Sequence, residues 1–340
     1  MQRKIFISGV NGQDGAYLAR DVINRGCVVF GGVRSCQNSN LTNLKNLGIL
    51  DDVTLVDFDL AKSEDINKCI NKILPDEFYN FAGLSSVNQS WKYPQLTFKV
   101  NATGVVRILE ALRQANNNCR FFQAGSSEMF GCTKAGFQDE ETPFHPNNPY
   151  GIAKLAAYHA VQSYRASYKI FAANGIMFNH ESPLRPETNV SRKITRSLAK
   201  VSLGHADMLR IGNLDSKRDW GYAPEYVQGM FALLQNDVAL DMVFATGHTH
   251  SVRDFINISA RHLGIEIDWT GVGVDEVGVD KASGKTIVKT DPEFYRPSDI
   301  LQTKGRADKA RQALGWEAKV DIVELTKIMI EHDLATLANT

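Results

Sequence analysis

The sequence predicts an α/β fold: a Rossmann-type, doubly wound parallel sheet with a smaller C-terminal α/β part. Three observations support this prediction. Short apolar runs alternate with helix-like stretches through the first half of the chain, and a glycine-rich turn joins the first run to the first of these stretches. Beyond about residue 180 the pattern becomes less regular and richer in Arg and Lys. Strands alternating with helices of this length form βαβ units, which give a parallel sheet covered on both faces.

The expected strands are short and apolar, and the expected helices show apolar residues at helical spacing. The strands are residues 5–10, 28–33, 53–57, 78–81, 120–124 and 170–176. The helices are residues 12–24, 100–114, 150–168 and 320–337. We expect a nucleotide-binding domain over residues 1–178, and a mainly substrate-binding part over 179–340 that interleaves with it.

The charge balance limits the kinds of partner. Lys and Arg together number 38, as do Asp and Glu, so the formal net charge is zero. Binding to nucleic acid or to a membrane surface needs a basic excess, so we expect neither partner.

The cysteines and the N-terminus indicate a cellular compartment. The five cysteines are scattered, without a CxxC pair or a Cys/His cluster at zinc spacing, so we expect reduced thiols and no metal site. The first strand begins almost at the N-terminus, which leaves no room for a signal peptide, and no apolar run approaches the roughly 18 residues of a membrane helix. These features predict a cytoplasmic protein of enzyme size.

A glycine-rich turn follows the first strand and opens the first helix. Glycines at this place permit a tight turn and let the backbone approach a pyrophosphate, which the helix N-terminus then stabilises. The alternative is an ordinary turn between a strand and a helix. The candidate cofactor-binding residues of the turn are Gly9, Asn11, Gly12, Gln13, Asp14 and Gly15.

The end of the second strand indicates which dinucleotide binds. An acidic residue there would hold the ribose 2′-hydroxyl of NAD, but the chain has Arg34 followed by Ser35. An Arg next to a hydroxyl suits a 2′-phosphate, so we expect NADP, although Arg34 could instead be a solvated loop residue. Asp59 and Leu60 follow the third strand and would lie close to the adenine.

Tyr150 and Lys154 are the strongest candidates for chemistry. Residues four apart share a helix face, so Lys154 can reach the cofactor ribose and lower the pKa of the Tyr150 phenol. A phenol with a lowered pKa can accept the proton that leaves as a hydroxyl is oxidised. Chance YxxxK pairs are common on helices, but this one follows a glycine-rich turn at a suitable interval.

Ser126 and Glu128 follow an apolar strand, at the carboxyl end of the parallel strands, where ligands bind. Ser126 could hydrogen-bond the reacting hydroxyl. A carboxylate such as Glu128 can take a proton beside a new ketone and deliver one to a leaving hydroxyl. The alternative is that Glu128 caps a helix or pairs with a surface Lys.

Several segments, spread over nearly the whole chain, resemble the signatures of the GDP-mannose 4,6-dehydratase family. The glycine-rich turn resembles that family's GVTGQDG opening. Residues 179–183 (NHESP), 212–221 (GNLDSKRDWG) and 295–297 (YRP) look like its C-terminal signatures. The resemblance implies an extended short-chain dehydrogenase that converts GDP-D-mannose to GDP-4-keto-6-deoxy-D-mannose with NADP, by internal hydride transfer and loss of water. It also implies a homodimer or homotetramer.

By this resemblance, the catalytic residues of the family fall on Ser126, Glu128, Tyr150 and Lys154. Its contacts to the GDP-sugar would fall on Ser85, Asn179, Lys193, Arg218 and Arg296. Arg and Lys side chains suit the two phosphates of GDP. The chain departs from the family in having Ser126 for the usual Thr and Arg34-Ser35-Cys36 for Arg-Arg-Ser, where the loop can reach a neighbouring subunit.

Three other functions remain open at this point. A dehydratase of another GDP-sugar, such as GDP-manno-heptose, would share all the chemistry and differ only in its sugar pocket. A reductase or epimerase of a GDP-4-keto-6-deoxy sugar would keep Tyr150 and Lys154 without needing Glu128. A catalytically silent scaffold would be free to lose any of the four catalytic residues.

Overall fold

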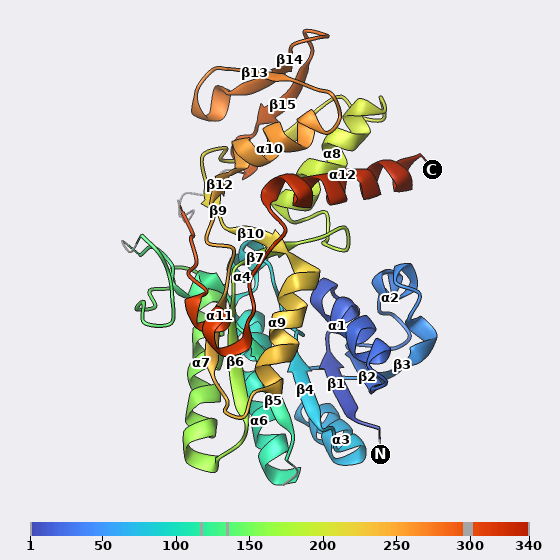
Figure 1. Ribbon diagram of the computed structural model, residues 1–340, viewed down its shortest axis with the longest axis vertical. Coiled ribbons are helices and arrows are strands. Elements are labelled where there is room, and N and C mark those ends of the chain that lie inside the picture. Colours follow the sequence, from blue (N-terminus) through green and yellow to red (C-terminus); the bar gives the residue numbers. More distant parts are fainter. Residues whose placement is uncertain (1, 116–117, 134–135, 295–301, 339–340) are drawn as a thin grey trace. The chain divides into compact units, whose positions relative to one another are not determined.

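The computed structural model describes residues 2–115, 118–133, 136–294 and 302–338. The chain forms two compact units, and each unit is built from segments that are separate in the sequence (Figure 1). The first unit contains Met1–Phe178, Ala223–Phe244 and Arg306–Glu317. The second contains Asn179–Tyr222, Ala245–Gly305 and Ala318–Thr340.

The first unit is built on a seven-stranded parallel sheet, which confirms the predicted fold class. The strand order is β11-β6-β5-β4-β1-β2-β3, so the order reverses between β1 and β4. Ligands bind at such a reversal in open α/β sheets. The strands are β1 (Lys4–Ser8), β2 (Val28–Val33), β3 (Val53–Asp57), β4 (Glu77–Asn80), β5 (Arg120–Ala124), β6 (Ala172–Met177) and β11 (Asp241–Phe244).

Strands β2, β3 and β5 have the bounds that the sequence predicts, and β1, β4 and β6 differ from the prediction by one or two residues at each end. The first strand was expected to reach residue 10 but ends at Ser8, because Gly9 has a φ of +70° and turns the chain away from the strand. Strand β11 was not predicted. It comes from the second half of the sequence and pairs with β6.

Helices pack in pairs against the sheet of the first unit. Helix α1 contacts α9, while α3 contacts α6 and α6 contacts α7. The longer helices are α1 (Gln13–Asn24), α3 (Ser63–Ile73), α6 (Gly104–Ala115), α7 (Pro149–Tyr168) and α9 (Ala223–Gln235). The shorter ones are α2 (Thr42–Asn46), α4 (Val87–Lys92), α5 (Pro94–Phe98) and α11 (Asp308–Leu314). A π-helical stretch, Lys99–Thr103, leads into α6.

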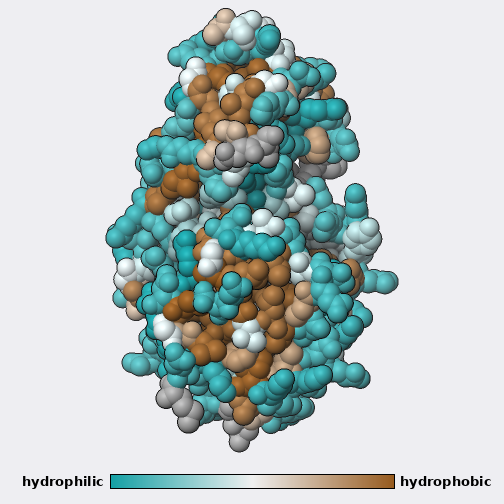
Figure 2. All heavy atoms as spheres, turned by 90° about the vertical axis from the view of Figure 1, so that its right-hand side faces the viewer, coloured by the Kyte–Doolittle hydropathy of each residue, from teal (hydrophilic) through white to brown (hydrophobic). Residues whose placement is uncertain are grey.

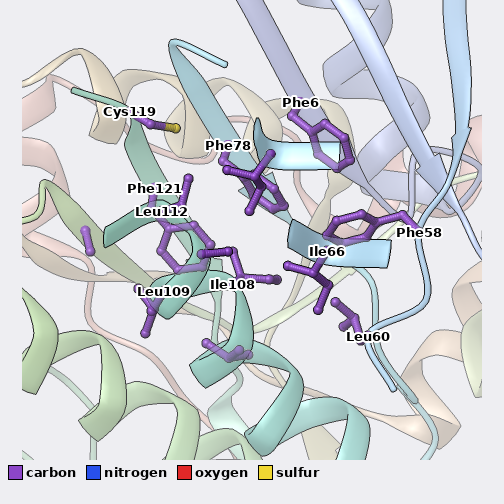
Figure 3. Close-up of a cluster of buried hydrophobic side chains, with 14 of the residues drawn as sticks. Phe6, Phe58, Leu60, Ile66, Phe78, Ile108, Leu109, Leu112, Cys119 and Phe121 are labelled. Carbon is purple, nitrogen blue, oxygen red and sulfur yellow. The ribbon is translucent and has the colours of Figure 1, made fainter. Parts of the chain in front are cut away.

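The core between the sheet and helices α3 and α6 is aromatic (Figure 3). Phe6 on β1 stacks on Phe78 of β4, with ring centroids 4.7 Å apart, and Phe121 of β5 continues the row. Ile108 and Leu112 of α6 are buried against them, as expected from their helical spacing. Burying side chains of this size stabilises the fold by roughly 1.5–3 kcal/mol each.

The second unit has its own core, and its described residues form three small sheets. The largest sheet has the order β13-β14-β15-β8, with β13 (Ile267–Thr270), β14 (Val277–Asp280), β15 (Thr286–Thr290) and β8 (Leu209–Ile211). The other two pair β10 (Trp220–Tyr222) with β7 (Asn179–Glu181), and β12 (His250–Ser251) with β9 (Lys217–Arg218). Its helices are α8 (Val190–Ser202), α10 (Val252–Arg261) and α12 (Ile322–Leu337), which pack against one another around Trp220 and Phe255.

The surface is mixed in polarity. On the face shown in Figure 2, hydrophobic residues gather in a broad area bordered by hydrophilic ones. Within the described ranges, no helix combines the length and the apolar character needed to span a bilayer.

Candidate active site

The glycine-rich turn connects β1 to α1 in a shape that only glycine allows. Gly9 donates its N–H to the Gly32 carbonyl at 2.8 Å, and a Cβ added to Gly9 would lie 2.9 Å from the Ala82 nitrogen. A Cβ on Gly15 would lie 2.4 Å from the Gly9 oxygen. Helix α1 begins at Gln13 after Gly12, which has no side chain to cap it. The N-terminus of a helix carries a partial positive charge, which suits an anion at this place.

The polar residues of the turn hold it against its surroundings. Asn11 donates its amide to the Asn40 carbonyl at 3.0 Å, and Asn43 donates to the Asn11 carbonyl at 3.1 Å. Gln13 donates to the Asp14 carboxylate at 2.9 Å. These bonds tie the turn to the segment that follows β2.

The residues predicted to meet the adenosine half of the cofactor lie at the ends of β2 and β3. Arg34 follows β2, is exposed, and makes no hydrogen bond or ion pair with another described residue. Asp59 accepts from the Ala61 N–H at 2.9 Å. Leu60 is buried, and its carbonyl accepts from Arg107 at 2.8 Å.

Ser126 and Glu128 lie directly after β5. Ser126 is buried, and its hydroxyl accepts from the Glu128 N–H at 3.2 Å, which starts a short 3₁₀ turn over Ser127–Met129. The Glu128 side chain is half-buried. It makes no ion pair with a described Lys or Arg, so the alternative of a surface ion pair does not apply.

Tyr150 and Lys154 lie on the first turns of α7, and both are buried. The Lys154 Nζ is 5.7 Å from the centroid of the Tyr150 ring, so the predicted i, i+4 pair is close in space. Lys154 donates to the Ala124 carbonyl at the end of β5, at 2.7 Å. This bond anchors the ammonium beside the Ser126 segment.

Asn148 is a residue that the sequence analysis missed. Its side-chain oxygen caps α7 by accepting from the Gly151 N–H at 2.8 Å, and its amide donates to Glu128 Oε2 at 2.8 Å. One buried side chain therefore sets both the start of the Tyr150 helix and the direction of the Glu128 carboxylate. An Asn before a Pro at the start of a helix is a recognisable capping signal, but the contact to Glu128 depends on the fold.

A buried polar chain crosses the sheet toward Lys154, and it was also missed. Ser8 on β1 donates to the Asn80 side chain at 2.5 Å, and Asn80 on β4 donates to Gln123 of β5 at 2.8 Å. Gln123 donates to the Ala124 carbonyl at 2.9 Å, which is the oxygen that Lys154 also contacts. Polar residues inside otherwise apolar strands are the signal for such a chain, because buried polar groups need partners.

Burial lowers the pKa of Lys154 to about 8, because taking the ammonium out of water disfavours its charged form. The Asp14 carboxylate opposes this effect and raises the pKa. The interaction shows that the glycine-rich turn and the Tyr-Lys pair belong to the same charged region of the first unit.

We predict a pH-dependent stability difference between the wild-type protein and Lys154→Met, both without cofactor. The folded-state pKa lies below the unfolded value of 10.5, so below pH 8 the folded protein bears the full cost of burying the ammonium. Between pH 8 and 10.5 the unfolded chain binds more protons, so this cost disappears as the pH rises. The unfolding free energy of wild type, measured in urea relative to the variant, should rise by roughly 3 kcal/mol across this window. If the difference in unfolding free energy stays constant or falls between pH 8 and 10.5, the prediction is wrong.

Ser85 lies on an exposed loop after β4. Asn101, in the π-helical stretch, fixes this loop by accepting from the Leu84 N–H and donating to the Leu84 carbonyl, both at 2.9 Å. Asn101 is a further buried polar residue that the sequence analysis did not identify.

The remaining predicted contacts belong to the second unit. Asn179 on β7 pairs in register with Trp220, two residues beyond Arg218 on β9. Lys193 on α8 is half-buried and lies over the Phe294 ring, with its Nζ 3.4 Å from the centroid. Burial lowers the pKa of Lys193. Arg296 lies outside the described residues.

Asp219 supports the strand that contains Arg218. It is fully buried, and its carboxylate accepts from the backbone N–H groups of Thr246, Gly247 and Gly305 at 2.9, 2.9 and 3.1 Å. Burial raises the pKa of Asp219, although these hydrogen bonds oppose the effect. The carboxylate joins two loops, one with Thr246 and Gly247 and one with Gly305, to the residue that follows Arg218. The sequence analysis did not identify it.

Comparison with known proteins identifies the family. The model of the family described as GDP-mannose 4,6 dehydratase matches residues 6–329. A GDP-mannose 4,6-dehydratase of Sinorhizobium fredii (strain HH103) is 42% identical over 346 residues, which cover 99% of each chain.

Solved structures share the fold at lower identity. The UDP-glucose 4-epimerase of Thermotoga maritima, determined with UDP-glucose, has a TM-score of 0.83 at 19% identity, over 98% of this chain and 99% of its own. RMD from Pseudomonas aeruginosa, complexed with NADPH, has a TM-score of 0.76 at 18% identity, over 98% of this chain and 100% of its own.

The fold and the family match place the chain among the extended short-chain dehydrogenases, in the epimerase/dehydratase superfamily. Within this superfamily, the chain belongs to the GDP-mannose 4,6-dehydratase family. The resemblance found in the sequence motifs is confirmed.

Proposed function

We propose that this enzyme removes water from GDP-D-mannose to give GDP-4-keto-6-deoxy-D-mannose, with NADP as a bound cofactor. Family membership supports the activity. The observation that carries the proposal is the Glu128 carboxylate, which Asn148 holds at the start of the Tyr150 helix. An alcohol oxidoreductase needs Tyr150 and Lys154 but has no use for a second proton-transfer group at this place.

The residues at the turn fit a nicotinamide dinucleotide. Gly9 and Gly15 let the turn pack tightly against Ala82 and against itself, and the N-terminus of α1 would bind the pyrophosphate. Lys154 would hold the nicotinamide ribose. Asp59 and Leu60 would border the adenine, and the exposed Arg34 would bind the 2′-phosphate of NADP.

In the first half of the reaction, Tyr150 takes the proton of the C4 hydroxyl, with Ser126 hydrogen-bonded to the same oxygen. The Lys154 ammonium stabilises the phenolate that makes this transfer possible. A bound NADP would supply reversible hydride transfer between C4 and C6, so the reaction would need no external reductant.

In the second half, the C4 ketone acidifies the C5 proton, and Glu128 removes it. Glu128 then donates this proton to the C6 hydroxyl, which leaves as water. A proton returns to C5, and it balances the one that Tyr150 took from the C4 hydroxyl. One carboxylate therefore serves as base and then as acid.

The second unit would supply the contacts to the nucleotide. Lys193 and Arg218 would bind the two phosphates of GDP, because cationic donors pair well with phosphate oxygens. Asn179 and Arg296 would add hydrogen bonds to the same ligand, and Ser85 of the first unit would contact the sugar. The GDP-sugar would be the substrate of the enzyme.

A panel of sugar nucleotides tests the proposal. The enzyme with NADP is incubated with GDP-, UDP-, CDP- and dTDP-hexoses and with a GDP-manno-heptose, and loss of water is followed by mass. Loss of water from GDP-mannose, without net consumption of NADPH, is expected. If only the GDP-manno-heptose loses water, the substrate is that heptose and not GDP-mannose. If a 4-keto sugar consumes NADPH stoichiometrically, the enzyme is a reductase.

We predict that Asn148→Ser separates the two roles of Asn148. Serine is a good helix cap, so the melting temperature should stay close to that of wild type. It has no amide to donate to Glu128, so kcat for dehydration should fall about tenfold to a hundredfold with KM for GDP-mannose little changed. Asn148→Ala, which loses both bonds, should also lower stability by about 1 kcal/mol. An unchanged kcat in Asn148→Ser would contradict the proposed contact.

We also propose that the enzyme is a homodimer or homotetramer. Helices α4 and α5 both pack on α7, and together they expose Trp91, Tyr93, Leu96 and Ile152. Adjoining large apolar side chains on a surface are typical of a protein interface. Light scattering after gel filtration should give a multiple of the chain mass, and Trp91→Glu with Leu96→Glu should give a monomer. A monomeric wild-type protein would refute this part of the proposal.

A further inference from the structure

The end of β3 places an acidic side chain beside the loop that would meet the ribose 2′-position of the cofactor. Asp57 is the last residue of β3 and pairs in register with Val33, the last residue of β2. Its Oδ1 accepts from the Cys36 N–H at 2.7 Å. The carboxylate therefore lies against the loop that begins with Arg34, where Rossmann enzymes recognise the ribose 2′-substituent.

The Asp57 carboxylate is charged at neutral pH. The Cys36 backbone N–H, together with the Cys36 thiol, lowers the pKa of Asp57, and the Lys62 ammonium contributes in the same direction. Burial and the nearby Asp57 raise the pKa of the Cys36 thiol, which therefore stays protonated. The loop contributes the Arg34 cation, and the adjoining end of β3 contributes the Asp57 anion.

We propose that Asp57 is a cofactor-specificity residue, whose carboxylate weakens binding of the NADP 2′-phosphate and favours the 2′-hydroxyl of NAD. The inference rests on the proposed function, since it concerns the same cofactor site. A phosphate dianion near the carboxylate is repelled, whereas a ribose hydroxyl can donate a hydrogen bond to it. Arg34 acts in the opposite direction, because a guanidinium binds phosphate well and gains little from a hydroxyl.

Binding of NADP⁺ and NAD⁺ to the cofactor-free enzyme tests the inference by calorimetry, without relying on turnover. Asp57→Asn keeps an oxygen that can accept from the Cys36 N–H but removes the charge. It should tighten NADP⁺ binding by about fivefold to tenfold and should not tighten NAD⁺ binding. Arg34→Ala should weaken NADP⁺ binding by about tenfold and leave NAD⁺ binding within about twofold.

Asp52→Asn is the matched control. Asp52 is an exposed carboxylate that immediately precedes β3, at the opposite end of the strand from Asp57. It lies about 16 Å from Asp57 along the strand, so its removal should leave the ratio of the two affinities unchanged. Asp57→Ser is a second variant without the charge, and it should also tighten NADP⁺ binding relative to NAD⁺ binding.

The outcomes separate this inference from the proposed function. If wild type binds both dinucleotides and neither neutral variant changes the ratio of affinities by more than about twofold, Asp57 does not set the specificity. If the wild-type enzyme binds neither dinucleotide, the proposed function fails, whatever Asp57 does.

Discussion

Glu128→Gln is expected to lower kcat for dehydration by about 10²–10⁴-fold, the effect of losing a group that serves as both base and acid. Glutamine preserves the shape of the side chain and can still accept the hydrogen bond from Asn148, which the wild-type carboxylate receives at 2.8 Å. Binding of cofactor and GDP-mannose should therefore change by less than about threefold. The measurements are steady-state release of water and calorimetric binding of both ligands.

A single-turnover experiment identifies the step that fails. Tyr150, Ser126 and Lys154 remain intact in Glu128→Gln, so oxidation at C4 should still occur and reduced cofactor should accumulate to the amount of enzyme. Glu141→Gln is the matched control, because Glu141 is exposed and its removal changes the net charge equally. Product formation by Glu128→Gln at the wild-type rate would show that Glu128 has no role in the elimination.

Asp333→Ala is expected to lower the unfolding free energy by about 3–5 kcal/mol, because it leaves a buried guanidinium without its partner. Asp333 on α12 is fully buried and forms an ion pair with Arg192 of α8, which is also buried. The same carboxylate lies 3.5 Å from Arg196. Helix α8 contains Lys193, a proposed contact to the GDP phosphates, so we also expect weaker GDP-mannose binding.

Two further variants separate the ion pair from general damage to α12. Glu331→Ala removes an exposed carboxylate from the same helix and should change stability by less than about 0.5 kcal/mol. Arg192→Met combined with Asp333→Leu removes both charges, so its loss should be smaller than that of Asp333→Ala alone. Equal losses in the single and double variants would mean that the packing of these residues matters more than the charge pair.

The elements predicted correctly are those whose signals are local. Strands β2, β3 and β5 are short apolar runs bounded by polar residues, and their bounds match the prediction. Helix α7 (Pro149–Tyr168) lies within one residue of the predicted range 150–168. The pairing of Tyr150 with Lys154 needs only the helix repeat, so it too was predictable from spacing.

The membership of the sheet was not predictable in the same way. Strand β11 joins β6 although 63 residues, from Phe178 to Leu240, separate the two in the sequence. Its apolar segment resembles many others in the second half of the chain. It pairs with β6 because β6 has a free edge in the folded sheet, and such an edge is not visible in the sequence.

Some features of the candidate site were predictable from local sequence patterns, and others were not. Glycines in the turn, Ser126 and Glu128 after a strand, and the Tyr150–Lys154 spacing are local patterns with a chemical reason. The contacts of Asn148 to Glu128, of Asp57 to Cys36 and of Asp219 to two loops join distant parts of the chain. The hydrophobic periodicity of the sequence gives no sign of these contacts.

The sequence by itself determined the fold class, the glycine-rich turn after β1 and the helix spacing of the residues proposed to perform the chemistry, because backbone conformation and helix spacing act over a few residues. The tertiary structure decided how these residues are supported: which side chain holds the Glu128 carboxylate, which chain of buried amides leads to Lys154, and which carboxylate adjoins Arg34. Buried polar groups must find partners wherever the fold brings them, and those partners are set by proximity in space.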